Sequence, residues 1–210
     1  MALPRITPYP LPGPEAIPAP RVPWRADPSR AVLLVHDLQN YFLAAFTPDA
    51  PPLAPALANT ARLLAWARSN GVPVVYSHQR GGQSPEERGL QLDFWGPGVP
   101  ADEWAQAVPE VVAPAEGEVL LTKWKYSAFV RTDLAERLAA AGRDQLVLAG
   151  VYAHIGVQLT AADAWSRDIQ AFVVADAVAD FSERQHLDAL AWMAGRCAVV
   201  VGTDQLLEGR

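Results

Sequence analysis

The sequence contains a single cysteine among its 210 residues, and this scarcity excludes several kinds of protein. One thiol cannot form an intrachain disulfide or a cysteine-based zinc site, so the chain fits a reducing compartment, and we expect it in the cytoplasm. The cysteine, Cys197, lies in the apolar run RCAVVV. In that setting a buried structural thiol is a better interpretation than a nucleophile.

Long apolar segments are also missing. No stretch approaches the roughly 18 residues that a membrane span requires, and the opening MALPRITPYPLPGP lacks the apolar core of a signal peptide. Acidic residues outnumber basic residues by 23 to 17, which gives a net charge of −6. Such a chain has no general attraction for nucleic acid or anionic membranes, so we predict neither as a partner.

Several catalytic and phosphate-binding motifs are absent as well. The chain has no GxGxxG after a strand and no Walker loop, so phosphate binding of either kind is unsupported. It also lacks the GxSxG elbow that carries the nucleophile of serine α/β-hydrolases. Its four histidines, His36, His78, His154 and His186, show no metal-ligand spacing. We therefore predict neither a metal nor a cofactor.

Proline is concentrated at the start of the chain, where nine of the 19 prolines fall within the first 28 residues. Because proline removes a backbone donor and fixes φ, this segment cannot be a helix or a central strand. Its apolar residues favour an extended arm packed on a surface, such as that of a partner subunit, over a disordered tail. We therefore predict an arm over residues 1–28 and a single globular domain over residues 29–210.

From Arg30 onward, short apolar runs alternate with helical stretches. The runs are apolar almost throughout, as parallel strands covered on both faces are, and they span residues 31–36, 72–77, 119–122, 145–149, 171–175 and 197–201. Helices are predicted over residues 55–70, 132–141 and 182–194, the last opened by a capping-box pair, Ser182 and Gln185. This alternation predicts a three-layer, doubly wound, Rossmann-like α/β fold, with about six parallel strands and helices on both faces.

Polar residues collect where the predicted strands end. Asp37 follows the first strand, Gln79 the second, Lys123 the third and Tyr152 the fourth, while Asp176 ends the fifth. In open parallel sheets, ligands bind beyond the carboxyl ends of the strands. The sequence therefore predicts a site at this edge, built from segments that lie far apart in the chain.

Long blocks of the chain resemble the isochorismatase family. These are AVLLVHDLQNYF (31–42), LTKWKYSAF (121–129), GRDQLVLAGVYAHIGV (142–157) and VADAVADFS (174–182), together with GLQLDFWGPG (89–98) and ITPYPLP (6–12). The wider superfamily of cysteine hydrolases is similar at Asp37 and Lys123, but the position of its cysteine is occupied here by Gly156. Without a thiol no acyl-enzyme can form, so we do not expect amide hydrolysis.

The resemblance implies an enzyme that hydrolyses the vinyl (enol) ether of isochorismate, of 2-amino-2-deoxyisochorismate, or of both, with release of pyruvate. Val157, after the glycine, favours the phenazine-pathway branch of the family, which acts on the amino compound. The chain ends at Arg210, so we expect no aryl carrier domain. The substrate would be a small dicarboxylate, and the family and the apolar arm indicate a homodimer. The alternative is an idle family member that serves as a binding or scaffold protein.

Asp37 is the candidate general acid, because hydrolysis of an enol ether begins with slow protonation of its terminal carbon. A free aspartate is almost fully ionised at pH 7, so its pKa has to rise. Desolvation behind the first strand and the charges of the substrate would raise it, whereas Lys123 would lower it. We therefore expect the rise mainly with substrate bound. Lys123 is the candidate anchor for a substrate carboxylate; a purely structural ion pair is the alternative for both residues.

The remaining candidates bind substrate. The resemblance assigns the second carboxylate to Gln79 and Arg88, and arginine offers a bidentate fork suited to it. The alternative for Arg88 is a place in a solvated loop, RGGQSPEERG. Tyr152 and the backbone N–H of Gly156 are candidates for a further hydrogen bond to a carboxylate. The family also tends to have a non-proline cis peptide beside this tyrosine.

Two aromatic residues, Phe42 and Trp95, are candidates for the walls around the ring of the substrate, although both are also ordinary core candidates. His36 precedes Asp37, and by strand alternation it points to the opposite face of the sheet. We therefore assign it no role.

Overall fold

The computed structural model describes residues 3–209 and has at its centre a sheet of six parallel strands. The strands are β1 (Ala31–His36), β2 (Val74–His78), β3 (Val119–Thr122), β4 (Gln145–Val151), β5 (Gln170–Ala179) and β6 (Ala198–Val201), in the order β3-β2-β1-β4-β5-β6. This order reverses direction between β1 and β4, as in Rossmann-like sheets. The predicted fold class is confirmed. Residues 1–2 of the predicted arm and residue 210 of the predicted domain lie outside the described residues.

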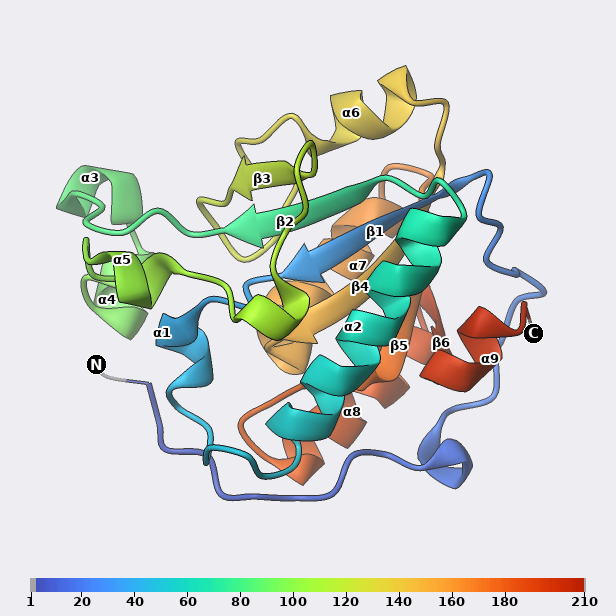
Figure 1. Ribbon diagram of the computed structural model, residues 1–210, viewed down its shortest axis with the longest axis horizontal. Helices are drawn as coiled ribbons and strands as arrows, with labels where there is room; N and C mark the ends of the chain where they lie inside the picture. The colour runs from blue at the N-terminus through green and yellow to red at the C-terminus, as the bar shows by residue number, and fades with distance from the viewer. Residues whose placement is uncertain (1–2, 210) are drawn as a thin grey trace.

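Helices surround the sheet (Figure 1). They are α1 (Asn40–Leu43), α2 (Leu53–Ser69), α3 (Pro85–Arg88), α4 (Gln91–Trp95), α5 (Glu103–Gln106), α6 (Leu134–Ala140), α7 (Gln158–Trp165), α8 (Glu183–Ala194) and α9 (Thr203–Leu207). The short helices α3, α4 and α5 lie together beyond the arrowheads of β1 and β2. Within residues 3–209, no helix combines the length and the hydropathy needed to cross a bilayer.

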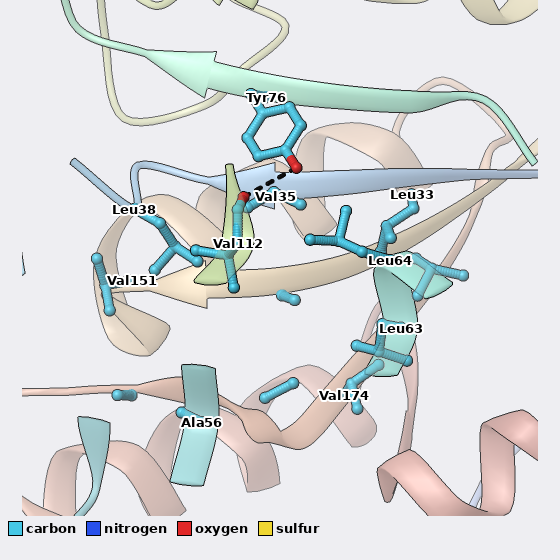
Figure 2. Close-up of a cluster of buried hydrophobic side chains, with 14 of the residues drawn as sticks. Leu33, Val35, Leu38, Ala56, Leu63, Leu64, Tyr76, Val112, Val151 and Val174 are labelled. Atoms are coloured by element: carbon cyan, nitrogen blue, oxygen red, sulfur yellow. Dashed lines mark hydrogen bonds between the residues drawn. The ribbon is translucent and has the colours of Figure 1, made fainter. Parts of the chain in front are cut away.

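Both faces of the sheet are apolar, because successive side chains along each strand point to opposite faces and most of them are apolar. Leu33 and Val35 of β1 pack on the face covered by α2, α9 and the N-terminal arm, whereas Val32 and Leu34 pack on the face covered by α6, α7 and α8. Figure 2 shows the first face, with Leu64 of α2 beside Leu33. Burial on both faces explains why the strands read as continuous apolar runs.

Strand β5 is longer than the sequence predicted. It continues to Ala179, so Asp176 lies inside the strand and the prediction that it ends the strand is wrong. Its carboxylate can be accommodated there because Oδ1 accepts hydrogen bonds from the backbone N–H and the hydroxyl of Thr203, at 2.8 and 2.7 Å. The residue that follows β5 is Asp180, which is fully buried.

The strands β1 and β4 approach each other closely at Gly150. This glycine has a φ of +118°, and a Cβ atom there would lie 2.1 Å from the carbonyl oxygen of His36. The position therefore tolerates no side chain. It fixes the geometry of the two strands where the sheet order reverses.

The proline-rich segment is extended apart from one turn at Pro14–Ala16, and it packs against its own chain. Ile6 is buried and donates its backbone N–H to the Ala45 carbonyl at 2.8 Å. The buried Tyr9 hydroxyl accepts a hydrogen bond from the backbone N–H of Asp180 at 2.7 Å. In Figure 1 the segment runs as a blue trace along the lower edge of the molecule. The division of the chain at residue 28 stays a prediction.

We expect Tyr9→Phe to destabilise the protein. The substitution removes the hydroxyl that pairs with the Asp180 N–H and leaves a buried donor without a partner, which costs about 1–3 kcal/mol. Urea unfolding measures this loss. Tyr41→Phe is the matched control, because the Tyr41 ring is only partly buried and its change should stay within about 0.5 kcal/mol. Equal losses in the two variants would contradict the role of the Tyr9 hydroxyl.

Candidate active site

A pocket opens at the carboxyl ends of β1 and β4, where the strand order reverses. This is the location typical of small-molecule sites in open parallel sheets. The strand ends supply its base, and the segment that carries α3 and α4 supplies one wall. Its lining includes every candidate from the sequence: Asp37, Phe42, Gln79, Arg88, Trp95, Lys123, Tyr152 and Gly156.

Asp37 lies at the base of the pocket, directly after β1. Its φ of +51° is unusual for a residue other than glycine, and such backbone conformations cluster at functional sites. Its Oδ1 accepts a hydrogen bond from the Ser77 hydroxyl at 2.5 Å, and its Oδ2 accepts one from Gln79 Nε2 at 3.0 Å. The Nζ of Lys123 lies 2.9 Å from Oδ2. Three donors therefore stabilise the ionised carboxylate.

Two opposing effects set the pKa of Asp37. Burial raises it, but the nearby charge of Lys123 and the hydrogen bonds together outweigh burial, so the pKa lies below its ordinary value. Burial also lowers the pKa of the neighbouring His36 to about 4, so its imidazole is neutral at pH 7. Without substrate, Asp37 is therefore a carboxylate beside a single ammonium group. Protonation requires that this balance change.

Lys123 is almost completely buried and has a second partner, the carbonyl of Lys125, at 2.8 Å. Lys125 in turn donates from Nζ to the carbonyl of Arg88 at 2.7 Å. Arg88 is 3% exposed, so the alternative of a solvated loop is wrong for this residue. The side chains of Ser84 and Glu87 form a capping box that begins α3 and holds Arg88 against the pocket.

Arg88 keeps part of its hydrogen-bonding capacity for a ligand. Its Nε donates to the Gly96 carbonyl at 3.2 Å, and Nη1 donates to Gln79 Oε1 at a long 3.4 Å. A guanidinium offers five N–H donors and Arg88 lines the pocket, so donors remain for a ligand. With Lys123, it gives an acidic protein a local cationic site for an anion.

Aromatic rings also line the pocket. The Tyr152 and Phe181 rings lie 4.4 Å apart between centroids, and Trp95 packs against Phe181 at 6.1 Å. Phe42 contacts Tyr152 edge-on and belongs to both the core and the pocket, and its contact with a substrate ring stays a prediction. The Tyr152 hydroxyl donates to the Phe42 carbonyl at 2.7 Å. The Val151–Tyr152 peptide is cis, which confirms the expectation drawn from the family.

Gly156 borders the pocket and has the imidazole of His36 behind it. A Cβ atom at this position would lie 2.2 Å from His36 Cε1, so the ring occupies the space that any side chain would need. The imidazole is held by a hydrogen bond from Nδ1 to the Val151 carbonyl at 2.9 Å. Alternation placed His36 correctly on the far face of β1 but did not reveal this contact. No thiol fits at position 156 while the ring is there.

The chain's cysteine is remote from this chemistry. Cys197 is buried in the core between α8 and β6, and burial raises the pKa of its thiol to about 11. The prediction of a structural thiol is confirmed. Among residues 3–209, no three histidine, cysteine, aspartate or glutamate side chains gather as a metal site would require.

Sequence reasoning missed several residues of the site. Ser77 donates to Asp37, and its place as the last residue of the strand predicted over residues 72–77 was the signal that could have identified it. Gln91 and Tyr41 also line the pocket. Asp180 lies behind it, with Oδ1 at 2.5 Å from His154 Nδ1, and thereby fixes the segment after β4. Helix α4 has only five residues, too few for a recognisable periodicity.

A parallel sheet with a buried acid–ammonium pair at its switch point defines an α/β enzyme whose site lacks a nucleophilic thiol. A sequence profile of the isochorismatase domain matches residues 31–205. The chain is 51% identical to phenazine biosynthesis protein PhzD of Pseudomonas fluorescens, over 98% of each chain. It is 49% identical to an isochorismatase of Bacillus subtilis, over 99% of this chain and 67% of that one.

The chain belongs to the isochorismatase family, and it is a hydrolase of that family. The family recognised from the sequence blocks is thus confirmed. A solved cysteine hydrolase from Pseudomonas syringae pv. phaseolicola 1448A has a TM-score of 0.80, at 23% identity, over 90% of this chain and 96% of that chain. At this identity the likeness supports the fold alone.

We expect Lys123→Met to destabilise the protein in a pH-dependent manner. In the native protein, the lowered pKa of Asp37 contributes stability above about pH 3.9, the ordinary pKa of aspartate, and this contribution is lost as the pH falls through the folded pKa. Without Lys123, the main charge that opposes burial is gone, so the pKa of Asp37 rises. The variant should lose about 3–5 kcal/mol at pH 7, and the loss should shrink toward pH 4.

Urea unfolding at several pH values measures this effect. Arg62→Met is the control, because it breaks an exposed ion pair with Asp204 and should cost less than about 1 kcal/mol. A loss for Lys123→Met that does not change between pH 7 and pH 4 would show that the two groups are not electrostatically coupled.

Proposed function

We propose that the protein hydrolyses the vinyl ether of isochorismate and of 2-amino-2-deoxyisochorismate, releasing pyruvate and the corresponding dihydro-dihydroxybenzoate or dihydro-hydroxyanthranilate. The observation that carries this proposal is the buried carboxyl of Asp37 beside Lys123, in a pocket whose nucleophile position is a glycine backed by an imidazole. Such a site can deliver a proton but cannot form an acyl-enzyme. The names of the relatives, a phenazine biosynthesis protein and an isochorismatase, support the same substrates.

Asp37 is the proposed general acid. It protonates the terminal CH2 carbon of the enol ether, and the electron pair of the double bond forms the new C–H bond, leaving an oxocarbenium ion. Water adds to that ion and gives up a proton, which returns the carboxyl to its acid form. The resulting hemiketal collapses to pyruvate and the ring alcohol. Slow protonation of carbon is the step that a positioned acid accelerates.

Substrate binding supplies the proposed rise in the pKa of Asp37. A substrate carboxylate that pairs with Lys123 or Gln79 competes for donors that now stabilise the Asp37 carboxylate. It also brings negative charge next to a buried carboxyl and expels water. All three effects favour the protonated form. The acid would therefore be generated only when there is a substrate to protonate.

We assign the two substrate carboxylates to the cationic groups of the pocket. Lys123 is the anchor near Asp37, and Arg88 with Gln79 takes the other carboxylate. Phe42, Trp95 and Tyr152 enclose the ring, and Gly156 leaves room for the reacting group. The Tyr152 hydroxyl already donates to Phe42, so it meets a ligand as a hydrogen-bond acceptor or through its ring. The alternative of an idle scaffold has no support in the comparisons.

We further propose that the protein is a cytoplasmic homodimer. The buried Cys197 fits a reducing compartment. Leu90 and Phe94, one turn apart around α4, are 78% and 65% exposed, which is unusual for large apolar side chains unless a partner covers them.

Asp37→Asn should lower kcat by about a hundredfold or more, because the amide retains the shape of the carboxyl but has no acidic proton to transfer. Substrate binding should persist, since Lys123 and Arg88 remain. Coupled detection of pyruvate, with each of the two substrates, measures kcat, and calorimetry with the inactive variant measures binding. Asp176→Asn, which changes a carboxylate outside the pocket, is the control for folding. A nearly active Asp37→Asn variant would refute the acid role.

The dimer can be tested by sedimentation equilibrium. The native protein should sediment as a dimer, and Leu90→Asp with Phe94→Asp should shift it toward the monomer. A Trp165→Asp variant controls for adding charge at an exposed apolar residue of α7, and it should leave the dimer intact. A native protein that is monomeric at high concentration contradicts the proposal.

A further inference from the structure

The side chain of Gln91 is buried at the pocket without any hydrogen-bond partner. It is 8% exposed and lines the pocket, and its Oε1 is a buried atom for which residues 3–209 provide no donor. Buried polar groups in native proteins are nearly always paired, so each exception calls for a reason. The wall of an active-site pocket is a place where a ligand can supply the missing partner.

The other buried polar side chains around the pocket already have partners. Asp37 is engaged by Ser77, Gln79 and Lys123, while Tyr152 is bound to the Phe42 carbonyl. The Tyr126 hydroxyl accepts from Trp95 at 2.6 Å. Tyr41 is only partly buried, so water can reach it. Within the described chain, Gln91 is thus the buried polar side chain of this pocket whose amide oxygen has no hydrogen-bond partner.

Helix geometry directs Gln91 toward the ring of a bound substrate. Gln91 and Trp95 are four residues apart in α4, so they lie on the same face of the helix, and both line the pocket. Trp95 belongs to the aromatic wall proposed to enclose the ring. The cations Arg88 and Lys123 are better partners for carboxylates than a neutral amide is. The group left for Gln91 is therefore an uncharged or amino substituent on the ring.

We propose that Gln91 is a specificity-determining residue, whose amide hydrogen-bonds the hydroxyl or amino substituent of the substrate ring. This inference rests on the proposed function. A primary amide carries both a donor and an acceptor, so it can pair with a hydroxyl and its oxygen can accept from an amine. A site that hydrogen-bonds such a group discriminates against a ligand that cannot form this hydrogen bond, because the buried amide is then left unpaired.

Stability separates this role from a structural one. If Gln91 served the fold, Gln91→Leu would lower the melting temperature. Because the amide is unpaired in the free protein, a leucine of similar size removes an uncompensated polar group, and the melting temperature should stay the same or rise. Activity should fall in the same variant, since the partner of the ring substituent is lost.

Gln83 provides a matched control. It is 9% exposed, and both polar atoms of its amide are buried without partners, but it does not line the pocket. Gln83→Leu makes the same chemical change in a comparable environment. It should leave the melting temperature unchanged or raised, and kcat/KM within about twofold of the native value.

The experiment measures pyruvate release from isochorismate and from 2-amino-2-deoxyisochorismate by the native protein and by Gln91→Leu, Gln91→Glu and Gln83→Leu. We expect Gln91→Leu to lower kcat/KM by about tenfold or more, with no loss of melting temperature. Gln91→Glu should raise the ratio of kcat/KM for the amino substrate over the hydroxy substrate by about tenfold, because a carboxylate attracts an ammonium. Both substrates carry the same carboxylates, so the repulsion between those groups and the carboxylate introduced by Gln91→Glu cancels in this ratio.

Three outcomes would overturn the inference about Gln91. One is full activity of Gln91→Leu on both substrates. Another is a loss of activity that accompanies a lower melting temperature in Gln91→Leu but not in Gln83→Leu. The third is an unchanged substrate ratio in Gln91→Glu. If the native protein released pyruvate from neither substrate, the proposed function itself would fail, and the inference with it.

Discussion

The site depends on one buried contact, the 2.9 Å approach of the Lys123 ammonium to the Asp37 carboxylate. Removing two charges from water is costly unless each satisfies the other, so the contact constrains every element that carries it. Strand β1 has to place Asp37, and β3 has to place Lys123, although β2 lies between them in the sheet. Ser77 and Gln79, at the end of β2, bridge this gap by donating to the same carboxylate.

In the proposed mechanism, the same contact explains how a carboxyl that is ionised without substrate can act as the acid. A carboxyl with a permanently raised pKa would be an unpaired polar group at the base of an apolar pocket. Here the free protein keeps a buried ion pair, and in the proposed mechanism the substrate's own carboxylates take over the cation. The imidazole of His36 contributes by being neutral and by excluding any side chain at Gly156. These groups support proton transfer in the proposed mechanism.

The sequence allowed the strands and the edge that carries the site to be predicted, because parallel strands buried on both faces are continuous apolar runs. Asp37, Lys123 and Gln79 could be named from their places at strand ends. The extension of β5 could not be predicted, because Asp176 is stabilised inside the strand by Thr203, 27 residues later. Gln91 was missed because α4 is too short to show periodicity, and the contact of His36 with Gly156 depends on the approach of β1 to β4 at Gly150.

The most direct test of this account is the pKa of the Asp37 carboxyl, measured by carbon-13 NMR in the free protein and with an unreactive dicarboxylate analogue of the substrate bound. Asp37→Asn identifies the resonance. The account predicts a pKa below the ordinary aspartate value in the free protein and a clear rise on binding. A pKa that is the same in both states would contradict the claim that the substrate creates its own acid.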